Sequence, residues 1–295
     1  MTTLSNKIDF AVIVCVNNAN PNGDPLNGNR PRVTYDGYGE LSDVSIKRKI
    51  RNRLQDMGYA IFVQSDDNRV DNYRSLRERA EAMLKGVDPN DKKKYQEAAC
   101  KTWVDVRAFG QVFAFKGKKG KKGGGEEDSD GVSIGIRGPV SIHPAFSVAP
   151  VLDRVSSIQI TKSVSGETSE KRGSDTMGMK HRVDHGIYVF YGSMNPQLAT
   201  KTGFYDEDAI AIKEALRTLF VNDASSARPE GSMEVHKVYW WTHNSPNGQY
   251  SSAKVHRLLK VRVKEGVDEP KDFVADYNIR LDELSGLKCE VMDGE

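Results

Sequence analysis

Apolar residues occupy every second position along residues 8–16, and this period of two predicts a β-strand over residues 7–17. One face of the strand is wholly apolar, at Ile8, Phe10, Val12, Val14 and Val16. The opposite face is apolar as well, at Ala11, Ile13 and Cys15. A strand with two apolar faces is typical of the middle of a sheet that is covered on both sides.

A long loop is predicted next, at residues 17–41, which are rich in Asn, Gly and Pro and show no helical period. Loops of this length in a compact protein are usually functional or lack a fixed structure. The first helix follows, with Ser42 or Asp43 as its N-cap and Gly58 at its end. Its apolar residues form a single packing stripe: Ile46, Ile50, Leu54 and Met57.

The pattern further along the chain predicts two polar helices and then a mixture of strands and one helix. The polar helices, at 70–85 and 89–101, are expected to belong to an insertion. The other elements are strands at 132–142, 156–164, 183–193 and 233–242, a helix at 207–221 and a further strand within 272–284. In chain order the main elements give the βαββαβ arrangement of a ferredoxin-like α+β fold with large insertions.

Two polar stretches interrupt these elements. Residues 116–131 are rich in Lys and Gly, then acidic, with no apolar residue, which predicts a flexible loop. The polar stretch between the strands at 156–164 and 183–193 contains Ser, Gly, Lys and Met, and it predicts a long hairpin that projects from the body.

Composition and charge place the chain among globular proteins. Its 295 residues, 38% of them hydrophobic, are enough to bury a core. The formal net charge is only +2, but its distribution is uneven: seven basic and three acidic residues lie between Arg30 and Arg53, whereas residues 264–295 hold ten acidic and four basic ones. This asymmetry suits a polyanionic partner, head-to-tail contact between copies, or both, although two ordinary solvated surfaces would look the same.

The three cysteines, Cys15, Cys100 and Cys289, are far apart and form no CxxC pair, which indicates neither a disulfide framework nor a zinc site. The N-terminal residues show no signal-peptide pattern, and no apolar run approaches the roughly 20 residues that cross a bilayer. We therefore expect a cytoplasmic protein with no membrane partner and no cofactor or metal ion.

The loop after the first strand is the first candidate binding site. Its segment Asn20-Pro21-Asn22-Gly23-Asp24-Pro25 combines turn residues and prolines, so that backbone N–H groups can point outward. Arg30 and Arg32 follow, and Lys47, Arg48 and Arg51 flank the apolar stripe of the first helix. Exposed amides followed by cations can meet successive phosphates of one strand, whereas a purely structural cluster of turns is the alternative.

Four segments together resemble a known family: NPNGDP after the first strand, LSDVSIKRKIRNRL on the first helix, DVRAFG at 105–110 and IRGPVSIHPAFSV at 136–148. They are similar to the backbone subunit of the type I CRISPR surveillance complex, Cascade, a member of the RAMP superfamily, and most similar to subtype I-C. The similarity extends over most of the chain in the same order.

The resemblance implies a hand-like fold. Residues 1–295 would form a single RRM-like palm domain, with a helical finger insertion at 60–135 and a protruding thumb hairpin at 156–185. Copies of such a subunit stack along the guide RNA, and each thumb displaces one base at a regular interval. Protein contacts are then to the backbone and shape of the RNA, while base pairing reads the sequence.

The resemblance also implies the RNA-binding residues. On the palm these are Asn22, Gly23, Arg30, Arg32, Lys47, Arg48, Arg51 and Arg137. On the thumb they are Met177, Met179, Lys180, His181 and Arg182. A methionine there would wedge between bases while a neighbouring cation holds the phosphate, although packing within the hairpin is an alternative for both methionines.

The resemblance implies a non-catalytic subunit of antiviral defence. Its partners would be the CRISPR guide RNA, the target DNA strand, further copies of the chain, and the guide-processing and large subunits of Cascade. The main alternative is a metal-dependent endoribonuclease that uses Asp24 or Asp36 in the loop after the first strand. Acid–base ribonuclease chemistry by a histidine and a stand-alone single-strand binding module are further alternatives.

Overall fold

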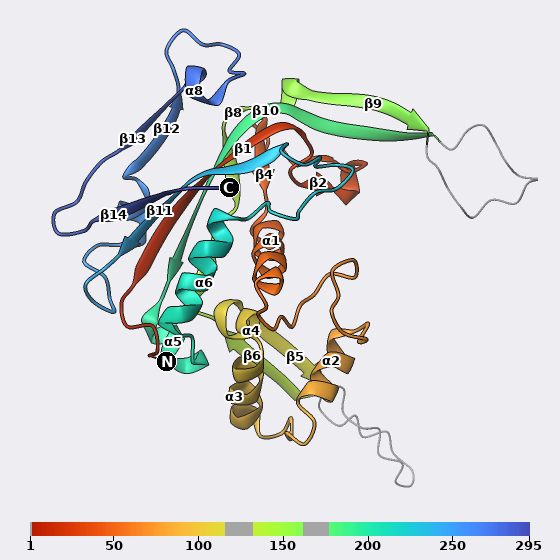
Figure 1. The fold of residues 1–295 in the computed structure, drawn as a ribbon, viewed down its shortest axis with the longest axis vertical. Coiled ribbons are helices and arrows are strands. Elements are labelled where there is room, and N and C mark those ends of the chain that lie inside the picture. Colours follow the sequence, from red (N-terminus) through yellow and green to blue (C-terminus); the bar gives the residue numbers. More distant parts are fainter. Residues whose placement is uncertain (1, 116–131, 162–176) are drawn as a thin grey trace, which may run out of the picture.

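An eight-stranded, antiparallel sheet forms the centre of the computed structural model, which describes residues 2–115, 132–161 and 177–295 (Figure 1). Six strands run across the sheet in the order β14 (Cys289–Asp293), β11 (Met233–Thr242), β1 (Ile8–Ala19), β10 (Met177–Met194), β8 (Ala145–Pro150) and β4 (Tyr38–Leu41). Two more strands also pair with β10: β7 (Val140–Ile142) and β9 (Val155–Thr161).

The first strand of the chain lies in the middle of this sheet, as its two apolar faces predict. Val12 is in register with Phe190 of β10 on one side and with Val238 of β11 on the other. Phe10, Val12 and Val14 are buried in one core, while Ile13 and Cys15 are buried in another. Layers on both faces of the sheet therefore pack against β1.

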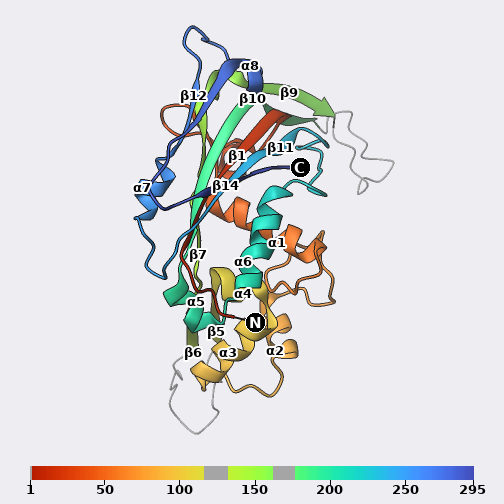
Figure 2. The same ribbon diagram turned by 60° about the vertical axis from the view of Figure 1, so that its left-hand side comes forward.

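The first face is covered by α1 (Asp43–Asp56) and α6 (Asp206–Arg217), as Figures 1 and 2 show. The side chain of Ser42 caps α1 by accepting a hydrogen bond from the Ser45 N–H, which confirms the predicted start. Ile46, Ile50 and Leu54 of α1 are buried in the core beneath it. α5 (Pro196–Thr202), which the pattern did not predict, precedes α6.

The second face is covered by the C-terminal part of the chain (Figure 2). It contains α7 (Ser252–His256), β12 (Leu259–Val263), α8 (Phe273–Asp276) and β13 (Tyr277–Leu281). The predicted strand within 272–284 exists as β13, but it pairs with β12 in a separate two-stranded sheet. The prediction missed β12, whose five residues are too few to show a clear period.

Residues 60–137 form a separate layer below α1 with its own apolar core (Figure 1). The elements are α2 (Leu76–Met83), α3 (Lys92–Thr102), α4 (Val104–Phe109), β5 (Gly110–Phe115) and β6 (Val132–Arg137). Phe62, Trp103 and Phe113 pack together, with ring centroids 4.6 Å and 5.1 Å apart around Phe62. The predicted flexible loop at 116–131 lies outside the described residues.

The prediction of one strand at 132–142 is wrong in one respect. This segment forms two strands, and they belong to two different sheets. β6 pairs with β5, whereas β7 pairs with β10. The chain changes sheet at Gly138, where a Cβ would lie 2.2 Å from the Ala108 carbonyl oxygen. Only glycine allows this close backbone approach.

The predicted loop at 17–41 is also more regular than expected. β1 continues to Ala19, and the loop then holds β2 (Gly23–Asp24), the 3₁₀ turn η1 (Pro25–Asn27), β3 (Arg30–Pro31) and β4. β2 and β3 pair with each other through Gly23 and Pro31. Strands of two residues leave no alternating pattern in the sequence, so periodicity cannot find them.

A hairpin of β9 and the N-terminal part of β10 projects from the body, following the 3₁₀ turn η2 (Leu152–Arg154) (Figure 1). Its register pairs Ile158 with Lys180 and Ser157 with His181. The strand predicted at 183–193 is therefore the inner half of a longer strand. Residues 162–176, which the sequence pattern assigns to this hairpin, lie outside the described residues.

Within the described ranges, no helix is long and apolar enough to span a membrane.

One buried carboxylate joins the separate layer to α1. Asp105, 1% exposed, accepts hydrogen bonds from the backbone N–H groups of Phe62 (2.7 Å) and Val63 (3.1 Å) and from Nε of Arg51 (3.0 Å). We expect Asp105→Ala to lower the free energy of unfolding by about 3–5 kcal/mol, because it leaves a buried cation and two amides unpaired. Urea denaturation followed by circular dichroism measures this.

Glu81→Ala is the control, since it breaks the exposed ion pair between Glu81 and Arg77 (2.7 Å) on α2. That change should cost less than about 1 kcal/mol. Equal losses in the two variants would contradict a special role for Asp105.

Candidate nucleic-acid interface

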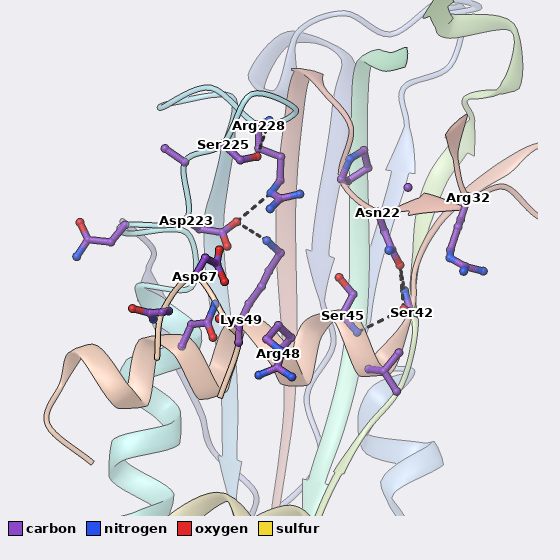
Figure 3. A pocket seen from close by; sticks show the side chains of 18 of the residues that line it. Asn22, Arg32, Ser42, Ser45, Arg48, Lys49, Asp67, Asp223, Ser225 and Arg228 are labelled. Carbon is purple, nitrogen blue, oxygen red and sulfur yellow. Dashed lines mark hydrogen bonds and ion pairs between the residues drawn. The ribbon is translucent and has the colours of Figure 1, made fainter. Parts of the chain in front are cut away.

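A groove of about 690 Å³ lies where four segments meet: the loop after β1, one side of α1, residues 65–68 and residues 222–228 (Figure 3). Four cations line it: Arg32, Arg48, Lys49 and Arg228. Three carboxylates line it as well: Asp56, Asp67 and Asp223. The groove is therefore of mixed charge rather than purely basic.

Hydrogen bonds hold the loop after β1 in one shape. Asn22 Oδ1 accepts from both the N–H and the hydroxyl of Ser42, each at 2.9 Å, which ties the loop to the first turn of α1. A Cβ on Gly23 would lie 2.0 Å from Oδ1 of Asn29, so a side chain here would displace the Asn29 side chain. Asn20 donates from its side chain to the Asn29 carbonyl (2.7 Å). Asn22 and Gly23 therefore shape the groove wall.

The ribonuclease alternative depends on two carboxylates in the loop after β1, those of Asp24 and Asp36. Asp24 caps the turn η1 by accepting from the Leu26 N–H (3.2 Å), and it pairs with Arg32 at 3.5 Å. Asp36 is exposed on the turn before β4. Among the described residues, no group of three or more His, Cys, Asp or Glu is arranged to hold a metal ion.

The predicted cations fall into two sets. Arg30 is exposed on β3, and Lys47 makes an exposed pair with Asp43 (2.9 Å). Arg48 lines the groove and donates to the Val63 carbonyl. Burial, and then the charge of Arg51, lowers the pKa of Arg48. Of the predicted cations, Arg32 and Arg48 line the groove.

Arg51 and Arg137 are placed differently. The Arg51 guanidinium faces Asp105 and lies 5.0 Å from the centroid of the Phe109 ring, so it serves the contact between α1 and the layer of residues 60–137. Arg137 is exposed at the end of β6, in register with Gly110 of β5. The structure does not bring either residue into the groove.

The predicted thumb residues lie on the outer part of β10. Met179 is 56% exposed, and Lys180 points to the opposite face of the hairpin because neighbouring strand residues alternate. Arg182 pairs with Asp184 at 3.4 Å. Met177 begins β10 opposite Thr161.

His181 connects this hairpin to the loop after β1. Its Nδ1 lies 2.7 Å from the Ser157 hydroxyl, and burial, followed by the charge of Arg30, lowers its pKa. β3, which carries Arg30, packs against β10. The fold thus places the root of the hairpin next to the basic loop.

The other histidines serve the fold. Asp9 is fully buried and contacts Nε2 of His243 (2.8 Å), Nε2 of His256 (3.6 Å) and Nζ of Lys7 (3.0 Å). His185 contacts Asn17 Oδ1 at 2.7 Å. Each of these contacts joins β1 to a neighbouring segment, which gives the buried histidines a structural role.

Sequence reasoning missed three groove residues: Lys49, Asp223 and Arg228. Lys49 was interpreted only as one cation of the basic region between Arg30 and Arg53. Nothing in the neighbouring sequence indicates that it pairs with Asp223. Asp223 and Arg228 follow the predicted helix at 207–221 in a stretch rich in turn residues. That composition signals a loop, but nothing in it signals contact with α1, about 170 residues earlier.

Comparison with solved structures gives many similar chains. A chain titled "CRISPR RNA-guided surveillance complex, pre-nicking" matches with a TM-score of 0.47 and 16% identity, over 89% of this chain and 84% of that chain. A second, titled "CRISPR RNA-guided surveillance complex", matches with a TM-score of 0.43 and 18% identity, over 80% and 68%. Both matches are too distant to carry an argument.

Sequence comparison is more decisive. The chain is 29% identical over 293 residues to a "CRISPR-associated protein Cas7" of Haloferax volcanii, a match that covers 96% of this chain and 84% of the relative. The family model described as "CRISPR-associated protein Cas7" matches residues 6–282. Since this match takes in nearly the whole chain, the protein belongs to the Cas7 family of CRISPR-associated proteins.

Proposed function

We propose that the chain is a non-catalytic backbone subunit of a type I-C Cascade, which binds CRISPR guide RNA and polymerises along it. The observation that carries the proposal is the groove, where a fixed loop and α1 of a Cas7-family protein present Arg32 and Arg48, with Arg30 and Lys47 on the neighbouring parts of β3 and α1. Cations without a set of base-reading side chains suit the phosphate backbone.

The arrangement of the sheet supports an RRM-like palm. Strands β11, β1, β10 and β8 are neighbours in that order, with α1 and α6 on one face, which is the ferredoxin-like order 4-1-3-2. The layer of residues 60–137 has its own core and suits the finger at 60–135. The β9–β10 hairpin suits the thumb at 156–185.

The same proposal covers the partners. Further copies of the chain, the guide-processing and large subunits, and the target DNA strand would assemble on the RNA in the cytoplasm. A protein that holds RNA by its phosphates leaves the base edges free, as pairing with a target strand requires.

The first test replaces two cations of α1, of which Arg48 lines the groove. Lys47→Ala with Arg48→Ala should weaken RNA binding about tenfold or more, equally for unrelated sequences, because two phosphate contacts are lost. The plot of log affinity against log salt should also become shallower by about one to two units. Fluorescence anisotropy over a salt series measures both.

Lys260→Ala with Arg280→Ala is the matched control, since it removes two cations from the β12–β13 hairpin on the other face of the sheet. Affinity unchanged in the groove variant, or lowered equally in the control, would contradict the groove as the RNA site.

A second test concerns the ribonuclease alternative. Labelled RNA incubated with excess protein and Mg²⁺ should stay intact, because the Asp24 carboxylate is engaged by its own turn and by Arg32. Cleavage that Asp24→Asn abolishes would instead establish a metal-dependent nuclease.

A third test shortens the proposed thumb. Replacing residues 159–179 with Asn-Gly joins Ile158 to Lys180, which are in register, through a two-residue turn. The unfolding midpoint should change little, because the described side chains removed include exposed ones such as Ile160 and Met179. The periodic reactivity of the bound RNA to base-modifying reagents should be lost. An unfolded product would show that the hairpin belongs to the core.

A further inference from the structure

Lys49 is a buried cation in the wall of the groove. Its side chain is 4% exposed, and its Nζ contacts Oδ2 of Asp223 and lies 5.2 Å from the centroid of the Phe220 ring. Removing a lysine from water costs free energy that its ion pair seldom recovers in full. A buried, ion-paired cation whose pKa is shifted and which lines a groove is therefore a candidate for a role in binding.

Asp223 holds a second cation as well. The same carboxylate oxygen accepts from Nε of Arg228 at 3.1 Å, so one aspartate bridges α1 and the loop after α6 (Figure 3). Paired backbone hydrogen bonds between Ser225 and Arg228 (2.8 and 3.0 Å) fix this loop, and the Ala227 carbonyl accepts from the Asn20 N–H (2.9 Å). The loop is thus a fixed wall opposite β2 and β3.

The charges around Lys49 come from three segments. Arg48 and Asp56 line the groove from α1, Asp67 lines it from residues 65–68, and Asp223 and Arg228 line it from the loop after α6. Burial lowers the pKa of Lys49 to about 8; Asp223 opposes that shift and Arg228 adds to it. Lys49 is therefore charged below about pH 8 and loses its proton as the pH rises above that value.

A buried hydroxyl gives an independent sign of a polar ligand. Ser65 lines the same groove, and its Oγ is buried without a hydrogen-bond partner in the part of the chain that the structure describes. Buried polar groups are nearly always hydrogen-bonded, so this hydroxyl lacks a partner, which an oxygen of a ligand that enters the groove would supply.

We propose that Asp223 is a positioning residue that keeps Lys49 charged and Arg228 in place, so that the two cations and Ser65 form a second phosphate-binding wall. The inference rests on the proposed function, because it names a further part of the same RNA site. Its consequence is an RNA affinity that falls as the solution becomes alkaline.

The test measures anisotropy with an RNA of adenine and cytosine only, whose bases do not titrate near pH 8. Wild-type affinity should fall about three- to tenfold between about pH 7 and pH 9, because Lys49 loses its charge. Lys49→Arg should bind at neutral pH within a few fold of wild type and lose the pH dependence, because a guanidinium stays charged. Asp223→Asn should weaken binding about tenfold at neutral pH.

Asp282→Asn is the matched control. Asp282 also pairs with one lysine and one arginine, Lys260 and Arg280, but on the β12–β13 hairpin outside the groove. It should leave both the affinity and its pH dependence unchanged.

Asp223→Asn leaves the buried Lys49 without its ion-pair partner. The double variant Lys49→Met with Asp223→Asn is therefore measured as well, because neither of its two substituted residues is charged. The double variant should fold, bind more weakly than wild type and show no pH dependence. A double variant that binds like wild type, or a Lys49→Arg variant that keeps the pH dependence, overturns the inference alone. Wild-type protein that does not bind RNA overturns the proposed function and the inference together.

Discussion

The fold depends on β1 being enclosed on all sides. The strand is paired along both edges and packed on both faces, so each layer of the protein is built against it. Even its one charged side chain in the interior, Asp9, is neutralised by Lys7 and surrounded by two histidines. A strand held in this way gives the loop that follows it a fixed starting point, which a preformed binding surface needs.

The side chains of α1 contact three different parts of the protein. Ile46, Ile50 and Leu54 face the sheet, Arg51 reaches Asp105 of the lower layer, and Lys49 reaches Asp223. The remaining cations flank the groove. Residues that look alike in the sequence therefore have different roles, because each side of a helix meets a different part of the protein.

The sequence was informative where a physical signal is local. The period of α1, the Ser42 cap and the two apolar faces of β1 are all readable from neighbouring residues, and motif similarity pointed to a CRISPR-associated family, to which the chain belongs. Contacts such as that of Lys49 with Asp223 depend on the tertiary fold, so the residues next to them in the sequence do not indicate them. Elements of two to six residues, such as β2 and α4, are shorter than the windows in which periodicity is measured.

The layer of residues 60–115 and 132–137 begins and ends at nearly the same place in the fold. At its start the Ala60 carbonyl accepts from the Val104 N–H (3.1 Å), and at its end Gly138 lies against the Ala108 carbonyl, so both ends of the segment meet the short helix α4. A chain segment whose two ends are adjacent can gain or lose length at its far side without shifting the register of any central strand. The length of this segment can therefore change while the central sheet stays the same.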